Sequence, residues 1–181
     1  MSSMSFHYVK LKFGEKVRFN CLRCGRCCSS GPNVGLTAYD IRRIANFLNA
    51  DWRTLKGKYV VAVVADMVAI PTLRGNLHGE CVFLERVDGK TSCSIYPARP
   101  MRCRLYPFMP YSPSNNETIY LDTCCPGINV ETETEPPWEC IKEYYVEVKL
   151  HYARLYQLVF QEGCEPLEAL EKTIEDCAGE A

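Results

Sequence analysis

The run Cys21-Leu-Arg-Cys24-Gly-Arg-Cys27-Cys28 places four thiols within eight residues. Three of these thiols are spaced by three residues, so a loop around Gly25 can bring them to one metal centre, with the glycine giving the turn its backbone freedom. Cys27 and Cys28 are neighbours, and neighbouring side chains are expected to point apart. We therefore expect the pair either to serve two centres or to include one structural thiol.

The same C-x2-C-x2-C run opens the cluster motif of bacterial ferredoxins, in which a further cysteine is followed by proline. Here that fourth cysteine is missing locally, and a Cys-Pro pair occurs far away at Cys125-Pro126. A second group, Cys81, Cys93 and Cys103, is spaced too widely for one knuckle, so folding must bring its loops together. Together these positions give eight candidate metal ligands, enough for two four-cysteine sites or for one site with four spectators. They are Cys21, Cys24, Cys27, Cys28, Cys81, Cys93, Cys103 and Cys125.

Three arginines lie among these thiols, and we identify them as candidate cofactor-binding residues: Arg99, Arg102 and Arg104. A cation lowers the pKa of a neighbouring thiol, and a guanidinium can also hold a carboxylate or phosphate. The alternative, in which these arginines only solvate the loop, stays open. His78 is the one histidine near a motif, and we expect it to lie in an exposed loop.

The remaining cysteines are not expected to be ligands. Cys140 and Cys177 lie on predicted helices with apolar neighbours, where small buried thiols are common. Cys124 competes with Cys125, which we prefer because proline follows it.

The composition is that of an ordinary globular chain with one unusual feature. Of 181 residues, 47% are hydrophobic and 24% charged, which excludes wholesale disorder, and 12 are cysteines. The longest apolar stretch, residues 59–70, is too short to span a bilayer, and the N-terminus lacks the apolar core of a signal peptide. We therefore expect a cytoplasmic protein without a membrane segment, whose clustered thiols bind metal or carry out redox chemistry.

Charge is distributed unevenly along the chain. Residues 1–58 hold 11 Lys/Arg against 3 Asp/Glu, whereas residues 131–181 hold 4 against 13. A basic front could face nucleic acid, but no recognition motif accompanies it, so we expect no nucleic-acid partner. The other interpretation is that front and tail complement each other within one domain.

The periodicities predict an α+β fold, in which a small single domain is organised around the cysteine-ligated centre. Strands are expected at 8–13, 17–19 and 117–121, and 59–70 could be one buried strand. Thr37 with Asp40 resembles a capping box that opens a helix whose apolar face includes Ile41 and Ile44, and Asp51 is expected to cap a short second helix.

A long C-terminal helix is expected to begin after Pro136-Pro137 and to end before Gly163. Its apolar residues step by three and four and predict one core-facing stripe. They are Trp138, Ile141, Tyr145, Val148, Tyr152, Leu155 and Val159. A short final helix is expected at 166–177. We divide the chain into a cysteine-cluster core, residues 1–130, and a helical extension packed on it, residues 131–181.

Five sequence blocks carry a family resemblance. They are Phe19-Asn-Cys21-x-x-Cys24-Gly25-x-Cys27-Cys28, Leu36-Thr37-x-x-Asp40 with Arg43, Gly79-x-Cys81-x-Phe83-Leu84, Cys93-x-Ile95-Tyr96-x-x-Arg99-Pro100-x-x-Cys103-Arg104-x-Tyr106-Pro107-Phe108, and Cys125-Pro126-Gly127-Ile128. In these blocks the chain resembles the YkgJ-type cysteine-cluster family, whose members are described as zinc- or iron-chelating proteins. The resemblance implies a metal centre, and members are often labelled iron–sulfur oxidoreductases. Flagellin lysine-N-methylases share this region, but no second domain for such a substrate is evident, so we do not expect methyl transfer.

Three functions fit these observations. We favour an iron–sulfur protein with a [4Fe-4S] cluster and a redox, electron-transfer or cluster-dependent enzymatic role, because all-thiolate ligation and the C-x2-C-x2-C run are typical of it. A zinc-organised binding module without catalysis is the alternative, since four thiolates also form structural zinc sites. A thiol redox protein using either Cys27 and Cys28 or Cys24 and Cys27 is the third. The partner, whether a protein or a small molecule, is not identified by the sequence.

Overall fold

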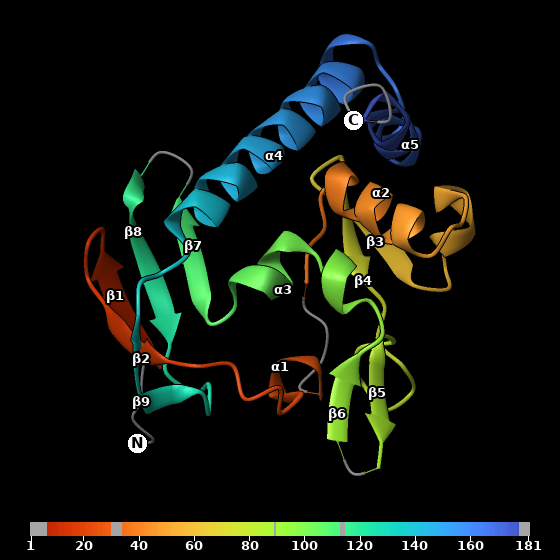
Figure 1. Cartoon of the computed structure of the whole chain (residues 1–181). Helices are drawn as coiled ribbons and strands as arrows, with labels where there is room; N and C mark the ends of the chain where they lie inside the picture. The colour runs from red at the N-terminus through yellow and green to blue at the C-terminus, as the bar shows by residue number, and fades with distance from the viewer. Residues whose placement is uncertain (1–6, 30–33, 89, 113–114, 178–181) are drawn as a thin grey trace, which may run out of the picture.

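The structure is a computed structural model that describes residues 7–29, 34–88, 90–112 and 115–177. Its elements form two groups, one built around β1, β7 and β8 and the other around α2, β3 and β4, and the long helix α4 runs from one to the other (Figure 1). The mixture of helices and antiparallel strands in a small single domain confirms the predicted α+β class. The elements in chain order are β1 (Tyr8–Lys12), β2 (Val17–Phe19), α1 (Arg26–Ser29), α2 (Ala38–Phe47), η1 (Trp52–Leu55), β3 (Val60–Ala65), β4 (Val68–Leu73), β5 (Leu84–Val87), β6 (Lys90–Cys93), η2 (Tyr96–Ala98), α3 (Met101–Leu105), β7 (Phe108–Ser112), β8 (Asn115–Asp122), β9 (Ile128–Thr134), α4 (Trp138–Tyr156), η3 (Gln157–Gln161) and α5 (Pro166–Asp176).

The first group is a three-stranded antiparallel sheet in the order β1-β8-β7. β1 pairs with β8 from Tyr8 opposite Asp122 to Lys12 opposite Thr118, so both predicted strands are confirmed. β2 pairs beside this sheet with β9. Apolar side chains of the sheet, α3 and the first half of α4 form the first core: Leu11, Leu105, Phe108, Ile119, Leu121, Trp138, Ile141 and Tyr145.

The second group is built on α2, which begins with the predicted capping box. The Thr37 hydroxyl accepts a hydrogen bond from the Asp40 N–H, and the Asp40 carboxylate accepts one from the Thr37 N–H. Asp51 likewise caps the 3-10 helix η1, as expected. The buried residues of this group form the second core: Leu36, Ala38, Ile41, Ile44, Ala45, Trp52, Leu55, Val60, Ala69, Leu73, Cys81, Phe83, Ile95, Leu155, Leu158, Val159, Ala169, Leu170 and Ile174.

α4 belongs to both cores, and this corrects the prediction of a single apolar stripe. Trp138 and Tyr145 are buried in the first core, whereas Leu155, and Leu158 in the following η3, are buried in the second. Because the two cores meet different sides of the helix, its buried face rotates along its length. Tyr152, which was predicted to lie in the stripe, is 43% exposed, and its neighbour His151 is 1% exposed instead.

Residues 59–70 differ from the single buried strand that was predicted. They contribute to a hairpin in which β3 pairs with β4, and the turn between the strands places Asp66 and Met67 at positive φ. The outer strand β3 is exposed over most of its length, including Val63 and Val64. An apolar run of this length therefore forms two short strands here, because two adjacent residues in the left-handed region reverse the chain.

The final helix α5 confirms the prediction for residues 166–177. Its buried residues include Leu170 and Ile174, while Leu167 is exposed. Within the described residues, neither α5 nor another helix combines the length and apolar character needed to cross a membrane.

The basic front and acidic tail of the chain meet each other in the fold. Arg43 pairs with Glu147, Arg53 with Glu175, and Lys56 with Glu171. Each pair joins the N-terminal part to α4 or α5. These contacts favour the interpretation in which the charge asymmetry is resolved within one domain.

Candidate metal centre

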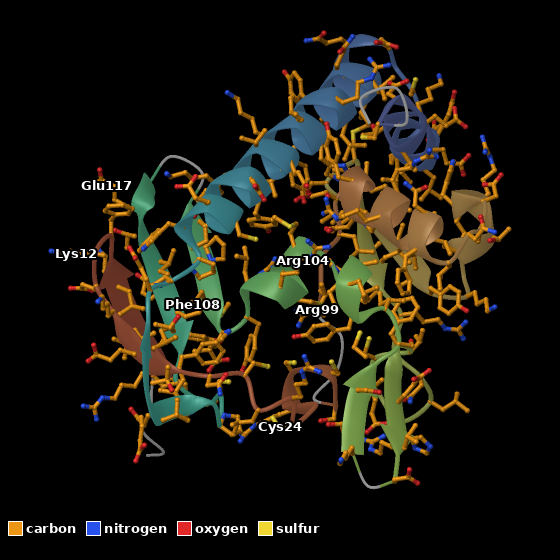
Figure 2. The ribbon with its side chains drawn as sticks, in the orientation of Figure 1. Lys12, Cys24, Arg99, Arg104, Phe108 and Glu117 are labelled. Carbon is orange, nitrogen blue, oxygen red and sulfur yellow. The ribbon has the colours of Figure 1, made fainter. Side chains whose placement is uncertain are left out.

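A cavity of about 590 Å³ lies between the two groups of elements, and its wall carries six of the eight predicted ligands. They are Cys21, Cys27, Cys28, Cys81, Cys93 and Cys103. The predicted ligands Cys24 and Cys125 lie outside this lining, and Cys124 lies within it. In Figure 2, Phe108 on β7 and Arg99 mark opposite sides of this region, and Cys24 lies on the segment that passes below it.

The loop that bears the first four cysteines is held from one side by the β5–β6 region. Gly25 has φ +70°, and a Cβ there would stand 2.9 Å from the Cβ of Thr91, so glycine is required both by conformation and by space. The Thr91 hydroxyl donates to the Arg23 carbonyl at 2.7 Å. The Cys81 N–H donates to the Cys28 carbonyl at 2.8 Å, which brings the second cysteine group to the first.

The other side of the same loop is held by the Cys-Pro segment. The Asn20 N–H donates to the Gly127 carbonyl at 2.9 Å. A Cβ at Gly127 would stand 2.3 Å from the Asn20 carbonyl oxygen, so the backbones touch directly. This contact places Cys125 near the start of the loop, and burial followed by the charges of Cys24 and Cys21 raises the pKa of Cys125.

Cys103 is positioned by a contact between α2 and α3. The buried carboxylate of Asp40 accepts a hydrogen bond from the Met101 N–H at 2.9 Å, at the start of the short helix that carries Cys103. The same carboxylate caps α2 and accepts a bond from Arg43 at 2.6 Å. Arg43 in turn binds both carboxylate oxygens of Glu147 on α4, at 2.5 and 2.8 Å. The matched motif of Thr37, Asp40 and Arg43 thus joins α2, α3 and α4.

The thiols of Cys27 and Cys28 lie 3.8 Å apart, which differs from the expectation that these side chains point apart. The pair sits in the single helical turn of α1, where adjacent side chains diverge less than in an extended strand. The hydrogen bond between the thiols lowers the pKa of Cys27 to about 6, and the same bond and burial raise the pKa of Cys28. Cys27 is therefore the thiol most readily ionised in this pair.

The other thiols of the wall influence one another. Burial is the main cause that raises the pKa values of Cys81, Cys93 and Cys103, and the charges of neighbouring cysteines add to it. Cys27 acts on all three of these thiols and also on Cys125. The charge of Cys27 thus reaches thiols of both later segments of the chain.

The three predicted arginines differ in their positions. Arg99 and Arg102 line the cavity. The charge of Arg99 offsets part of the burial that raises the pKa of Cys93, and it adds a minor share to the lowering of the Cys27 pKa by the Cys28 hydrogen bond. Arg104 is not part of the lining. It donates to the carbonyls of Arg99 at 2.8 Å and Pro97 at 2.7 Å, and so fixes the loop that presents Arg99.

Residues with other roles complete the description of the predicted site. His78 is exposed in a loop, as expected. Burial raises the pKa of Cys140 on α4, Cys164 accepts a hydrogen bond from Lys172 at 3.3 Å, and Cys177 caps the end of α5.

The sequence did not single out Tyr106 and Asp122 as a pair, although both line the cavity. The Tyr106 hydroxyl donates to Asp122 at 3.1 Å, and the Cys124 N–H donates to the same carboxylate at 2.9 Å. Their closeness in sequence to Cys103 and Cys124 is the signal that could have identified them.

The sequence also did not single out His151, whose Nδ1 accepts a bond from the Ala38 N–H at 3.3 Å. Its Nε2 is buried without a hydrogen-bond partner, and burial lowers its pKa to about 4.

The donor set fits a thiolate-bound metal. Soft thiolates select zinc, copper(I) and iron–sulfur clusters, and the cavity brings thiols from distant segments to one wall. The described part of the chain contains no group of three or more His, Cys, Asp or Glu side chains at the spacing of a metal site. The fit therefore rests on the chemistry of the donors and on their shared cavity.

The CxxCxxCC pattern, described as "Putative zinc- or iron-chelating domain", matches residues 20–126, which is more than half of the chain. The chain belongs to the CxxCxxCC family. Its matched region contains all eight predicted ligands, which supports metal binding by this family member. It is also similar to an uncharacterized protein of Methanocaldococcus jannaschii, MJ0661, with 30% identity over 102 residues. The alignment covers 55% of this chain and about half, 51%, of that relative. No solved structure matches the chain.

Proposed function

We propose that this CxxCxxCC protein holds a [4Fe-4S] cluster and serves in electron transfer or in a cluster-dependent redox reaction. One observation carries the proposal: the Cys27–Cys28 turn shares a single cavity wall with Cys81, Cys93 and Cys103. A [4Fe-4S] cluster takes four cysteine thiolates, and the C-x2-C-x2-C run is a ligand arrangement that such clusters use.

The chain's own residues would support such a cluster in two ways. Arg99 favours ionisation of Cys27 and Cys93, and a thiolate, not a thiol, is the ligand. The buried side chains of Cys81 and Phe83 belong to the second core, and on that side they limit the access of solvent to the cavity. When bound, the cluster would supply one-electron redox chemistry, and its potential depends on this burial and on nearby charge.

A zinc-organised module is the second candidate, and the thiol separation of 3.8 Å in the Cys27–Cys28 pair favours it. Two sulfur ligands of tetrahedral zinc, each about 2.3 Å from the metal, lie roughly 3.8 Å apart. The eight candidate thiols would be enough for two zinc ions with four ligands each. In this case the chain would organise a binding surface without catalysis.

We propose a cytoplasmic location for either form. All twelve cysteines are free in the structure, and a thiolate-bound centre needs the reducing conditions found there.

The test is the content of iron, zinc and acid-labile sulfide in protein purified without oxygen, together with a visible spectrum. About four irons with equal sulfide, and a broad band near ~400 nm that dithionite bleaches, are expected. About one or two zinc ions and a colourless protein would replace the first proposal by the second. A protein with neither metal would overturn both.

A further inference from the structure

The cavity wall is rich in positive charge as well as in thiols. Four arginines line it: Arg23, Arg26, Arg99 and Arg102. Among the described residues of the lining, Asp122 is the only carboxylate, and it already accepts hydrogen bonds from Tyr106 and from the Cys124 N–H. The carboxylates of the described lining therefore do not match the number of its arginines.

Two of these arginines are held in place by one aromatic ring. The guanidinium of Arg99 lies 3.7 Å from the ring centroid of Tyr96, and that of Arg23 lies 4.7 Å from it. Arg99 also donates from Nε to the Tyr96 carbonyl at 3.1 Å, and Arg104 fixes the Arg99 backbone. Stacking and these bonds reduce the conformational freedom that an arginine loses when it binds an anion.

No carboxylate in the described part of the chain forms an ion pair with Arg23, Arg99 or Arg102. By contrast, Arg43 and Arg53 pair with acidic side chains. Arg23, Arg99 and Arg102 thus form no ion pair with a described side chain, whereas Arg43 and Arg53 use their guanidinium groups within the fold.

Much of the remaining wall is apolar. Phe83 and Ile95 line it from the second core, and Phe108 and Met109 line it from the β7 side. A cavity of about 590 Å³ lies within the range of small-molecule sites, which combine apolar walls with a few placed polar groups. The wall thus has room for the flat body of a small organic molecule beside the thiols.

We propose that this cavity binds a small organic anion, with its carboxylate or phosphate on Arg99 and its neighbours and its apolar body against Phe83 and Phe108. The inference rests on the proposed function, because the metal centre would occupy the thiol side of the same cavity. A guanidinium binds either anionic group through two parallel hydrogen bonds, so the two share one recognition chemistry.

The experiment is calorimetric titration of metal-loaded protein with benzoate and with phenyl phosphate. Benzamide, which has the shape of benzoate without its charge, is the matched ligand control. We expect at least one anion to bind, and benzamide to bind about tenfold more weakly or not at all, because it lacks the charge that strengthens hydrogen bonds to a guanidinium.

The decisive variant is Arg23→Gln, with Arg53→Gln as its control. Arg23 lines the cavity and lies over the Tyr96 ring at 4.7 Å; Arg53 also lies over an aromatic ring, Trp52, at 4.7 Å, but it does not line the cavity. Arg23→Gln should weaken anion binding about tenfold while metal content and circular dichroism stay unchanged, and Arg53→Gln should bind normally. If Arg23→Gln does not fold, Arg102→Gln takes its place.

The outcomes separate this inference from the proposed function. Full metal content with no binding of either anion, or equal binding of benzamide, would overturn the inference alone. Loss of metal in the folded Arg23→Gln variant would also overturn it, because the arginine would then act on the metal centre. Absence of metal from the wild-type protein would overturn the proposed function itself.

Discussion

The carboxylate of Asp40 accepts a hydrogen bond from the backbone N–H of Met101, 61 residues further along the chain, at 2.9 Å. Asp40 caps α2 and Met101 begins α3, so this one buried group sets the distance between the second core and the helix that bears Cys103. The position of a candidate ligand thus depends on a residue that need not touch metal.

Replacement of Asp40 by alanine tests this relationship. It leaves two buried N–H groups without an acceptor and removes one carboxylate from Arg43, so we expect the free energy of unfolding to fall by about 3 kcal/mol. Urea titration measures this change. Asp51→Ala, which removes an exposed cap, should cost only about 1 kcal/mol. Equal losses in the two variants would mean that Asp40 acts only as a helix cap.

Gly127→Ala tests the contact between the Cys-Pro segment and the cysteine loop. The added Cβ would stand 2.3 Å from the Asn20 carbonyl oxygen, so the segment that carries Cys125 must move away from Cys21. We expect partial loss of metal and about 1–3 kcal/mol of stability. Gly35→Ala is the control, because nothing lies within 4 Å of its Cβ position. A Gly127→Ala protein with normal metal content would show that Cys125 is not a ligand.

Cysteine substitutions test which thiols bind the metal. Cys24→Ser and Cys103→Ser should each lose metal and several kcal/mol of stability, because much of the folding free energy of a metal site comes from ligation. Cys140→Ser, on α4 and outside the cavity lining, should keep both. Elemental analysis measures the metal content, and thermal unfolding measures the stability. Full metal content in both Cys24→Ser and Cys103→Ser would refute the assignment.

His151 predicts a specific dependence of stability on pH. Burial lowers its folded pKa from 6.5 to about 4, so between these values the unfolded chain binds a proton that the folded chain does not. The free energy of unfolding is therefore highest above pH 6.5 and falls as the pH drops to about 4, by about 3 kcal/mol in total. Urea titrations of the wild type and of His151→Gln across this range isolate the effect, because acid release of metal is common to both proteins. A difference between them that stays constant with pH would contradict the prediction.

The sequence by itself predicted the features that depend on neighbours in the chain. The capping box at Thr37, the start of α4 after Pro137 and the turn at Gly25 follow from local hydrogen bonds and backbone conformation. The cysteine spacing also identified the family, because the motif is a property of sequence order.

The tertiary structure decided what depends on contacts between distant segments. The Cys27–Cys28 turn meets Cys81 through a backbone hydrogen bond, which no spacing rule encodes. Arg99 and Arg104 carry the same charge, but one lines the cavity and the other fixes the loop behind it.

The buried face of α4 rotates from Tyr145 to Leu155 because two cores meet the helix on different sides, and this is why helical periodicity misplaced Tyr152 and overlooked His151. Periodicity records which residues of one helix share a side. Which sides are covered is set by the elements that pack against it, and only the folded chain brings those elements together.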